Sequence, residues 1–388
     1  MGCGRLLLLA AAAFCIPSVR GWLWKFQAPF YGCNGCLGSR ARREKFNHPA
    51  GKMSCCPNRE IDLEDMWPHL AGKQTCASEA AGKVIREAWA RDVTSTAGVD
   101  DDGDSGISSD RRSSSWSVRR SVVPYNHGDT SLQGMVARPE GDGLPARLPG
   151  VILAHTAVGP QEDMILWKLD AIARLGYAAF ALDMFGTGHA LWDRAQSLAA
   201  RRPITEDRSL MQGRAMAAVR TLGLMEDVDE DRLAAVGYCF GGMTVLDLVR
   251  MAAAPSSAGG DDVNAIRGLK AVASLHGILA PISPGKEGRV GEDAVPGGGP
   301  ATLPRVLVLH ATADPFVPPE QVLEMEKEFA RIGAHAEIVK YGGDALHAFT
   351  RPEKTTQADR DAGLSYCKNA DQDSWRRVVA LLREELKQ

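Results

Sequence analysis

The sequence predicts an α/β protein with a mostly parallel central sheet and helices on both faces. From about residue 118 onward, short apolar runs alternate with longer amphipathic segments. The apolar runs show little polar alternation, which is typical of strands covered on both faces. Seven of the nine cysteines lie at or before Cys76, so disulfides cannot build the rest of the chain. A hydrophobic core must hold this region together, and the 45% hydrophobic content permits one.

The chain after residue 118 divides into strands and helices in order. A hairpin is expected within 121–136, with its turn at 126–129. The following expected strands are 150–155, 177–183, 233–237, 269–275, 304–310 and 335–341. The expected helices are 162–175, 206–222, 242–251, 319–332 and 373–386. Residues 281–302 are rich in proline, glycine and charge, which predicts a surface insertion.

The N-terminal part of the chain differs from the rest in composition. Residues 1–20 combine Arg5 with an apolar core that suits a targeting signal and is too short to span a bilayer. We therefore expect a secretory or organelle route, with the cytoplasm as the alternative, and no membrane span in the mature chain. Residues 92–117 are rich in Asp and Ser, which predicts a disordered linker before a domain at 118–388.

Residues 21–91 form a poorly ordered segment whose role the sequence leaves open. Its five cysteines are compatible with disulfides, metal-binding thiolates or free thiols: Cys33, Cys36, Cys55, Cys56 and Cys76. Zinc is the least favoured of the three, because no second pair or histidines stand at suitable spacing.

Charge and hydropathy exclude two classes of partner. Lys and Arg number 45 against 48 Asp and Glu, so no basic excess favours nucleic acid. A mean hydropathy of −0.17 excludes a polytopic membrane protein. The oligomeric state cannot be deduced from the sequence.

The strongest motif is G-Y-C-F-G-G at 237–242, between an expected strand and an expected helix. This is the context of a nucleophile elbow, a sharp turn that presents its central residue at the end of the sheet. The helix N-terminus lowers the pKa of a thiol at Cys239, and the backbone N–H of Phe240 is placed to hold an oxyanion. The alternative is a buried cysteine in a tightly packed turn.

Two further residues complete a catalytic pattern. Asp314 follows the expected strand 304–310, and His347 lies in a Gly-containing loop after the last expected strand. Taken alone, each has a plain alternative: a turn aspartate before proline and a surface histidine. The order nucleophile, acid, histidine is that of the α/β hydrolases. Together the three residues predict an acyl-transfer triad.

Residues from about 120 to 388 resemble the dienelactone hydrolase family, the carboxymethylenebutenolidase-like branch of the α/β hydrolases. The resemblance is carried by P-G-V-I-L-A-H at 149–155, L-G-Y-A-A-F-A-L-D-M-F-G at 175–186, V-G-Y-C-F-G-G at 236–242, S-L-H-G at 274–277, L-V-L-H-A-T-A-D-P at 307–315 and H-A-F at 347–349. It implies an α/β-hydrolase fold and a Cys239–Asp314–His347 triad.

The resemblance also implies substrate contacts. Arg351 matches an arginine that binds the substrate carboxylate, and Arg208 or Arg214 is the candidate for a second one before the elbow. The second oxyanion N–H is expected from Thr156 or Ala157. Thr156 stands where related enzymes carry a glutamate that activates the thiol, so this sequence departs from the family there.

The expected function is hydrolysis of a small-molecule ester or lactone, of the dienelactone kind, through a thioester on Cys239. Neither a metal nor an organic cofactor is required. A general carboxylesterase or thioesterase on the same triad is one alternative. A non-catalytic scaffold with a cysteine-rich binding segment is another.

Overall fold

The computed structural model describes residues 52–56, 59–62, 116–253, 266–282 and 303–387. Several expected features lie outside the residues that the structure describes: the signal at 1–20, the side chains of the five N-terminal cysteines, almost all of the linker at 92–117 and most of the insertion at 281–302. Those expectations remain predictions. Strands β1 (Lys52–Cys56) and β2 (Arg59–Asp62) form a two-stranded antiparallel sheet of their own.

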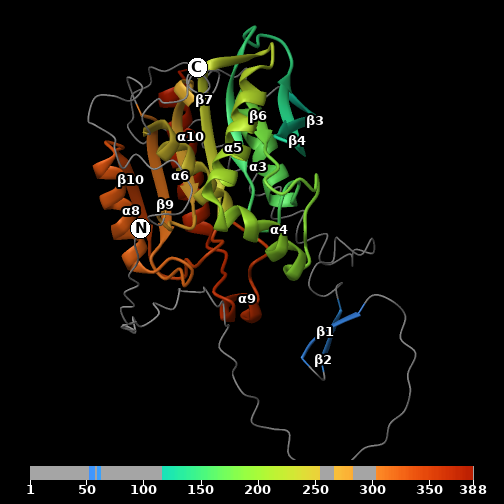
Figure 1. The fold of residues 1–388 in the computed structure, drawn as a ribbon, viewed down its shortest axis with the longest axis vertical. Coiled ribbons are helices and arrows are strands. Elements are labelled where there is room, and N and C mark those ends of the chain that lie inside the picture. The colour runs from blue at the N-terminus through green and yellow to red at the C-terminus, as the bar shows by residue number, and fades with distance from the viewer. Residues whose placement is uncertain (1–51, 57–58, 63–115, 254–265, 283–302, 388) are drawn as a thin grey trace, which may run out of the picture. The chain divides into compact units, whose positions relative to one another are not determined.

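The main sheet has eight strands in the order β10-β9-β8-β7-β5-β6-β4-β3 (Figure 1). Strands β5 to β10 run parallel, β4 pairs antiparallel with β6, and β3 pairs antiparallel with β4. The bounds are β3 (Ser117–His127), β4 (Thr130–Glu140), β5 (Leu148–Ala154), β6 (Ala178–Ala181), β7 (Val228–Tyr238), β8 (Leu269–Leu275), β9 (Arg305–Ala311) and β10 (Ala336–Tyr341). The carboxyl ends of the parallel strands therefore meet at one edge of the sheet, where catalytic residues gather in such folds.

Helices cover both faces of this sheet, as the sequence predicts (Figure 1). Helices α5 (Arg208–Gly223), α6 (Phe240–Ala253) and α8 (Pro319–Arg331) pack on one face. Helices α3 (Asp163–Arg174) and α10 (Lys368–Leu386) pack on the other. Along β5, Ile152 contributes to the first layer while Val151 and Leu153 contribute to the second, because alternate side chains of a strand point to opposite faces.

The predicted strands and helices after residue 118 are present, with ends that differ by a few residues. Helix α4 (Arg194–Glu206) is the main element that the sequence analysis missed. It buries only Ser197 and Ile204 and contains Pro203, so it lacks the apolar stripe that reveals a helix. Asp193 starts it by accepting a hydrogen bond from the Gln196 N–H. Helix α9 (Gln357–Asp361) is a single short turn.

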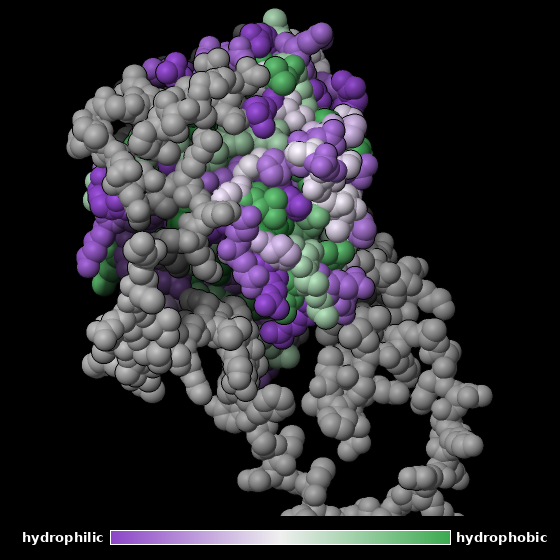
Figure 2. Space-filling model, in the orientation of Figure 1, coloured by the Kyte–Doolittle hydropathy of each residue, from purple (hydrophilic) through white to green (hydrophobic). Residues whose placement is uncertain are grey.

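The described part of the chain exposes few large hydrophobic side chains. In the view of Figure 2, hydrophilic side chains are interspersed with small apolar groups. Among described residues, the exposed large hydrophobic side chains lie on separate segments: Val122, Leu198, Leu224 and Leu323. No helix in the described ranges has the length and apolar content needed to cross a membrane.

Candidate active site

Cys239 occupies a strained turn between strand β7 and helix α6. Its φ of 56° lies in the left-handed region, which a non-glycine residue rarely adopts. Glycine at 241 permits this turn, because a Cβ there would lie 2.1 Å from the carbonyl oxygen of Ala154 on β5. The backbone of α6 thus approaches the sheet closely enough to hold the Cys239 side chain at the carboxyl edge. This geometry is that of a nucleophile elbow.

The structure brings the three residues of the predicted triad together. Nε2 of His347 lies 3.0 Å from Sγ of Cys239, and Nδ1 of His347 lies 2.7 Å from Oδ2 of Asp314. Asp314 follows β9 and His347 follows β10, and both side chains are buried while Cys239 is half-buried. The rings of Phe316 and His276 pack on His347, with centroids 4.8 Å and 5.2 Å away. The imidazole is therefore fixed between an acid and a thiol.

The charges of the triad favour an ion pair. Burial alone would raise the pKa of the Cys239 thiol, but the positive charge and hydrogen bond of His347 outweigh burial and lower it. Burial alone would lower the pKa of His347, but the Cys239 thiolate and Asp314 raise it to about 10. The thiol therefore loses its proton before the imidazolium does. Both shifts favour a thiolate–imidazolium ion pair over a neutral thiol beside a neutral imidazole.

Two backbone N–H groups face the place where an oxyanion would form. The N–H of Ala157 acts on the Cys239 sulfur and helps to lower the pKa of the thiol. Phe240 is the first residue of α6, so its N–H has no acceptor within the helix. Thr156 was the other predicted donor, but its N–H donates to Oε1 of Glu162 over 3.3 Å. Ala157 rather than Thr156 is therefore positioned beside the thiol.

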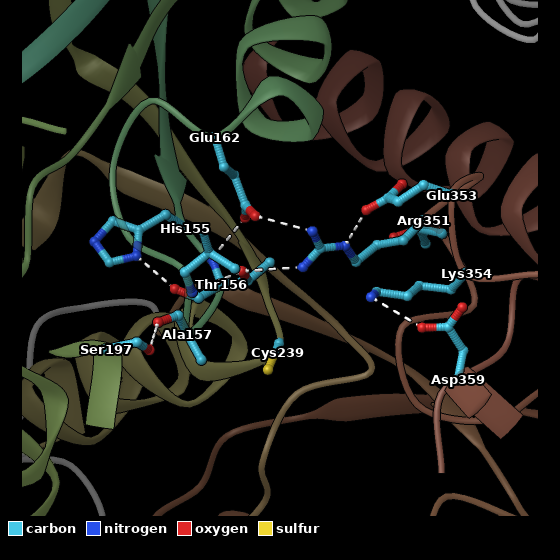
Figure 3. A network of polar contacts seen from close by, with 12 residues as sticks. His155, Thr156, Ala157, Glu162, Ser197, Cys239, Arg351, Glu353, Lys354 and Asp359 are labelled. Atoms are coloured by element: carbon cyan, nitrogen blue, oxygen red, sulfur yellow. Dashed lines mark hydrogen bonds and ion pairs between the residues drawn. The ribbon is translucent and has the colours of Figure 1, made fainter. Parts of the chain in front are cut away.

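Arg351 lies beside this loop and forms ion pairs with two glutamates, shown in Figure 3. Its Nη2 lies 3.3 Å from Oε2 of Glu162 and its Nε donates to Oε1 of Glu353 over 2.7 Å. Its Nη1 lies 3.5 Å from Oγ1 of Thr156, and the side chain is 8% exposed. The charge of Arg351 interacts with that of Cys239, but two carboxylates already contact its guanidinium. Its expected contact with a substrate carboxylate stays a prediction.

The two other predicted arginines do not face the thiol. Arg208 pairs through Nε and Nη2 with the buried Asp247, and its Nη1 donates to the carbonyl of Ala280. Arg214 donates from Nη1 to the carbonyl of Met184, and its charge acts on Asp183 and Tyr125. Neither guanidinium is directed at the reacting centre, because each is held by another part of the fold.

Arg201 and Glu162 are the site residues that the sequence analysis missed. The charge of Arg201, on α4, acts on the Cys239 thiolate, and its buried Nε has no hydrogen-bond partner among described residues. Its sequence signal is weak because α4 itself lacks apolar periodicity. Glu162 immediately precedes α3, and its carboxyl group is fully buried. A fully buried glutamate is unusual, but its burial can be recognised only once the fold is known.

Comparisons with known proteins agree with the fold. The profile of the dienelactone hydrolase family matches residues 132–386. A solved structure named m3DLH is 30% identical, covering 69% of this chain and 98% of its own, with a TM-score of 0.57. A dienelactone hydrolase-like promiscuous phosphotriesterase, P91 from metagenomic libraries, is 29% identical with the same coverage and TM-score.

A curated relative is similar over about half of this chain. The uncharacterized protein K02A2.1 of Caenorhabditis elegans is 29% identical over 185 residues, which is 47% of this chain and 98% of that protein. The family match extends over more than half of the chain and includes all three residues of the triad geometry. The chain belongs to the dienelactone hydrolase family of α/β hydrolases, and it is a carboxylic ester hydrolase of that class.

Proposed function

We propose that this protein hydrolyses small ester or lactone substrates of the dienelactone kind through a thioester on Cys239. The observation that carries the proposal is the continuous line Asp314–His347–Cys239, with contacts of 2.7 Å and 3.0 Å. Such a line suits a nucleophile, its base and the residue that orients the base. The backbone N–H of Ala157 acts on the thiol, so it is also placed to stabilise an oxyanion formed next to Cys239.

Acylation begins with the thiolate. Sγ of Cys239 attacks the carbonyl carbon, and the carbonyl electron pair moves to the oxygen, which the N–H groups of Ala157 and Phe240 stabilise. The oxyanion then collapses and the bond to the leaving oxygen breaks. The imidazolium of His347 gives its proton to that oxygen. Asp314 keeps the imidazole oriented by accepting from Nδ1.

Deacylation restores the enzyme. Neutral His347 takes a proton from a water molecule, and the resulting hydroxide attacks the thioester carbon. The oxyanion forms again at the same two N–H groups and collapses with release of the Cys239 thiolate. The products are a carboxylic acid and an alcohol or enol, and His347 keeps the proton as imidazolium.

The chemistry restricts the substrate. A thiolate is itself a good leaving group, so the tetrahedral adduct breaks forward only when the substrate oxygen leaves readily. Enol lactones and aryl esters meet this condition, whereas amides do not. Arg201 provides a positive charge near the thiol and is a candidate contact for a substrate carboxylate.

A general carboxylesterase is the second candidate, and the surroundings of Arg351 favour it. Two carboxyl groups already contact this guanidinium, so it attracts a substrate carboxylate less than a free arginine would. An uncharged ester then binds as well as an anionic one. The similarity to a protein named as a promiscuous phosphotriesterase makes an uncharged phosphotriester a useful further substrate to assay.

Turnover by the full chain tests the proposal. Dienelactone, its methyl ester, p-nitrophenyl acetate and paraoxon would be compared for wild type and Cys239→Ala. We expect turnover of at least one carboxylic ester or lactone, lost in Cys239→Ala, and an acyl adduct on the Cys239 peptide by mass spectrometry after acid quench. Hydrolysis that survives in a folded Cys239→Ala protein, or no turnover of any of the four, would contradict the proposal.

A further inference from the structure

The peptide group between Thr156 and Ala157 has contacts on both of its sides. Its N–H, on Ala157, acts on the Cys239 sulfur and helps to lower the pKa of the thiol. Its carbonyl oxygen, on Thr156, lies 2.7 Å from Nδ1 of His155. In a trans peptide the C=O and N–H bonds point in opposite directions, and the described chain contains no cis peptide. A contact that holds the carbonyl therefore also sets the direction of the N–H.

The other ring nitrogen of His155 determines which atom carries the proton. The backbone N–H of Met184 donates to Nε2 over 3.1 Å, so Nε2 presents its lone pair and the proton resides on Nδ1. Nδ1 then donates to the carbonyl of Thr156. The imidazole is fully buried, with the rings of Phe185 and Phe240 at 4.8 Å and 6.0 Å. Burial lowers the pKa of His155 to about 4, which keeps the ring neutral in this tautomer.

Other contacts hold this stretch of chain as well, and one of them reaches the same carbonyl, because the N–H of Gly159 donates to it over 3.2 Å. Glu162 accepts from the N–H of Thr156, and Ser197 on α4 donates to the carbonyl of Ala157 (Figure 3). Both contacts belong to the adjoining peptide groups. Without His155, the carbonyl of Thr156 would lose the shorter of its two hydrogen bonds and keep only that from Gly159, so the peptide would be less firmly oriented.

We propose that His155 is a positioning residue, which orients the oxyanion N–H of Ala157 toward Cys239 by donating from Nδ1 to the carbonyl of Thr156. The inference rests on the proposed function only for its effect on turnover. In the resting enzyme the same N–H acts on the Cys239 sulfur. Its orientation therefore also affects the acidity of the thiol in the absence of substrate. No substrate contact is assigned to His155.

Two substitutions test the contributions of the two ring nitrogens of His155 one at a time. In His155→Asn the amide nitrogen falls near the place of Nδ1 and restores the donor. In His155→Gln the longer side chain reaches the place of Nε2, where its oxygen accepts from Met184, but it leaves the carbonyl of Thr156 with the N–H of Gly159 as its donor. Both replacements are neutral, so neither changes the local charge. The pair therefore distinguishes orientation of the peptide from the general effect of replacing a buried ring.

Steady-state kinetics give the first readout. We expect His155→Gln to lower kcat about 10- to 100-fold with little change in KM, as for a displaced oxyanion donor. We expect His155→Asn to stay within about threefold of wild type, by the same reasoning. Equal losses in both variants, or a larger loss in His155→Asn, would overturn the inference. Thermal unfolding of both variants confirms that each is folded at the assay temperature.

The thiol itself gives a second readout that needs no hydrolysis. The rate of alkylation by iodoacetamide, followed against pH, measures the pKa of Cys239. Losing the N–H of Ala157 raises that pKa in His155→Gln, whereas His155→Asn leaves it near the wild-type value. If wild type hydrolyses nothing but the thiol pKa shifts as stated, the proposed function fails and the orientation by His155 stands. If the thiol pKa is the same in all three proteins, the inference fails.

Discussion

Glu162 and Arg351 form a buried ion pair, with Oε2 and Nη2 3.3 Å apart, directly behind the loop that faces the thiol. Burial raises the pKa of Glu162, and Arg351 partly offsets that effect. Glu353 contacts the same guanidinium, which holds the pKa of Glu353 below its ordinary value and keeps it ionised. Arg351 is therefore compensated by Glu353 in addition to Glu162. The positive charge of Arg351 is therefore less available to a substrate carboxylate.

Glu353→Gln should make the site prefer anionic substrates. Removing this carboxylate leaves Arg351 less compensated, so we expect kcat/KM for dienelactone to rise about 5- to 10-fold relative to its methyl ester. The two substrates share the reacting bond and differ in charge. The exposed Glu324 on α8 provides the matched control, since Glu324→Gln removes the same charge away from the site. An unchanged ratio in Glu353→Gln would show that Arg351 is already available to the substrate.

Arg201→Met should have the opposite effect on the anionic substrate. The charge of Arg201 stabilises the Cys239 thiolate, so its loss raises the pKa of the thiol. We expect kcat/KM for dienelactone to fall about 10-fold more than kcat/KM for the methyl ester. Arg202 is the neighbouring control: it is exposed and donates to Glu206 on the same helix over 2.9 Å. If Arg201→Met and Arg202→Met behave alike, Arg201 has no part in binding the anion.

The pH dependence of kcat/KM should follow the ion pair. The thiol has a lowered pKa, so the active thiolate is lost only when the pH falls below the ordinary thiol range. His347 has a pKa raised to about 10, so the proton for the leaving group is lost as the pH rises through about 10. A broad plateau should lie between the two limbs. A narrow bell centred near the ordinary histidine pKa of about 6.5 would contradict the ion pair.

Asp314→Asn isolates the contribution of the acid to this profile. The variant removes the carboxylate that helps to raise the pKa of His347, so the alkaline limb should move to lower pH. It also weakens the orientation of the imidazole, and we expect kcat to fall about 10²- to 10⁴-fold. Asp344 is exposed in the same loop as His347, so Asp344→Asn is the control for a change of charge alone. An alkaline limb that stays in place in Asp314→Asn would argue against the contact with Nδ1.

The triad could be predicted from the sequence because each of its residues has a local signal. Gly241 is required by the close approach of α6 to β5, and Asp314 and His347 follow apolar strands that end at the same edge. Arg201 and Glu162 have no such signal. Their roles depend on contacts with residues far away in the chain, Cys239 and Arg351, and on a helix that buries only two side chains.

The second arginine expected to bind substrate could not be identified from the sequence for the same reason. Arg208 and Arg214 both precede the elbow, and nothing near them in the sequence reveals their partners. Arg208 is held by Asp247 on α6, and Asp247 also accepts from Arg250, which in turn pairs with Glu328 on α8. This buried network joins three helices on one face of the sheet. Such a structural role becomes visible only when the helices are packed.

The other face of the sheet contains a buried ion pair whose loss should destabilise the fold. Nζ of Lys168 on α3 lies 3.2 Å from Oδ1 of Asp371 on α10, and Nζ also lies 4.9 Å from the centroid of the Trp375 ring. Both charged side chains are at most 4% exposed. Lys168→Met removes one charge and leaves the other buried, so we expect a loss of about 3–5 kcal/mol in the free energy of unfolding.

The double variant Lys168→Met/Asp371→Leu should recover much of that loss. It removes both buried charges and replaces them with apolar side chains, which removes the unpaired carboxylate. Urea unfolding of wild type, both single variants and the double variant gives the coupling free energy between the two residues. The exposed Arg202–Glu206 pair, treated in the same way, should change the free energy of unfolding by less than about 1 kcal/mol. Additive losses in the Lys168 and Asp371 variants would show that the two charges do not stabilise each other.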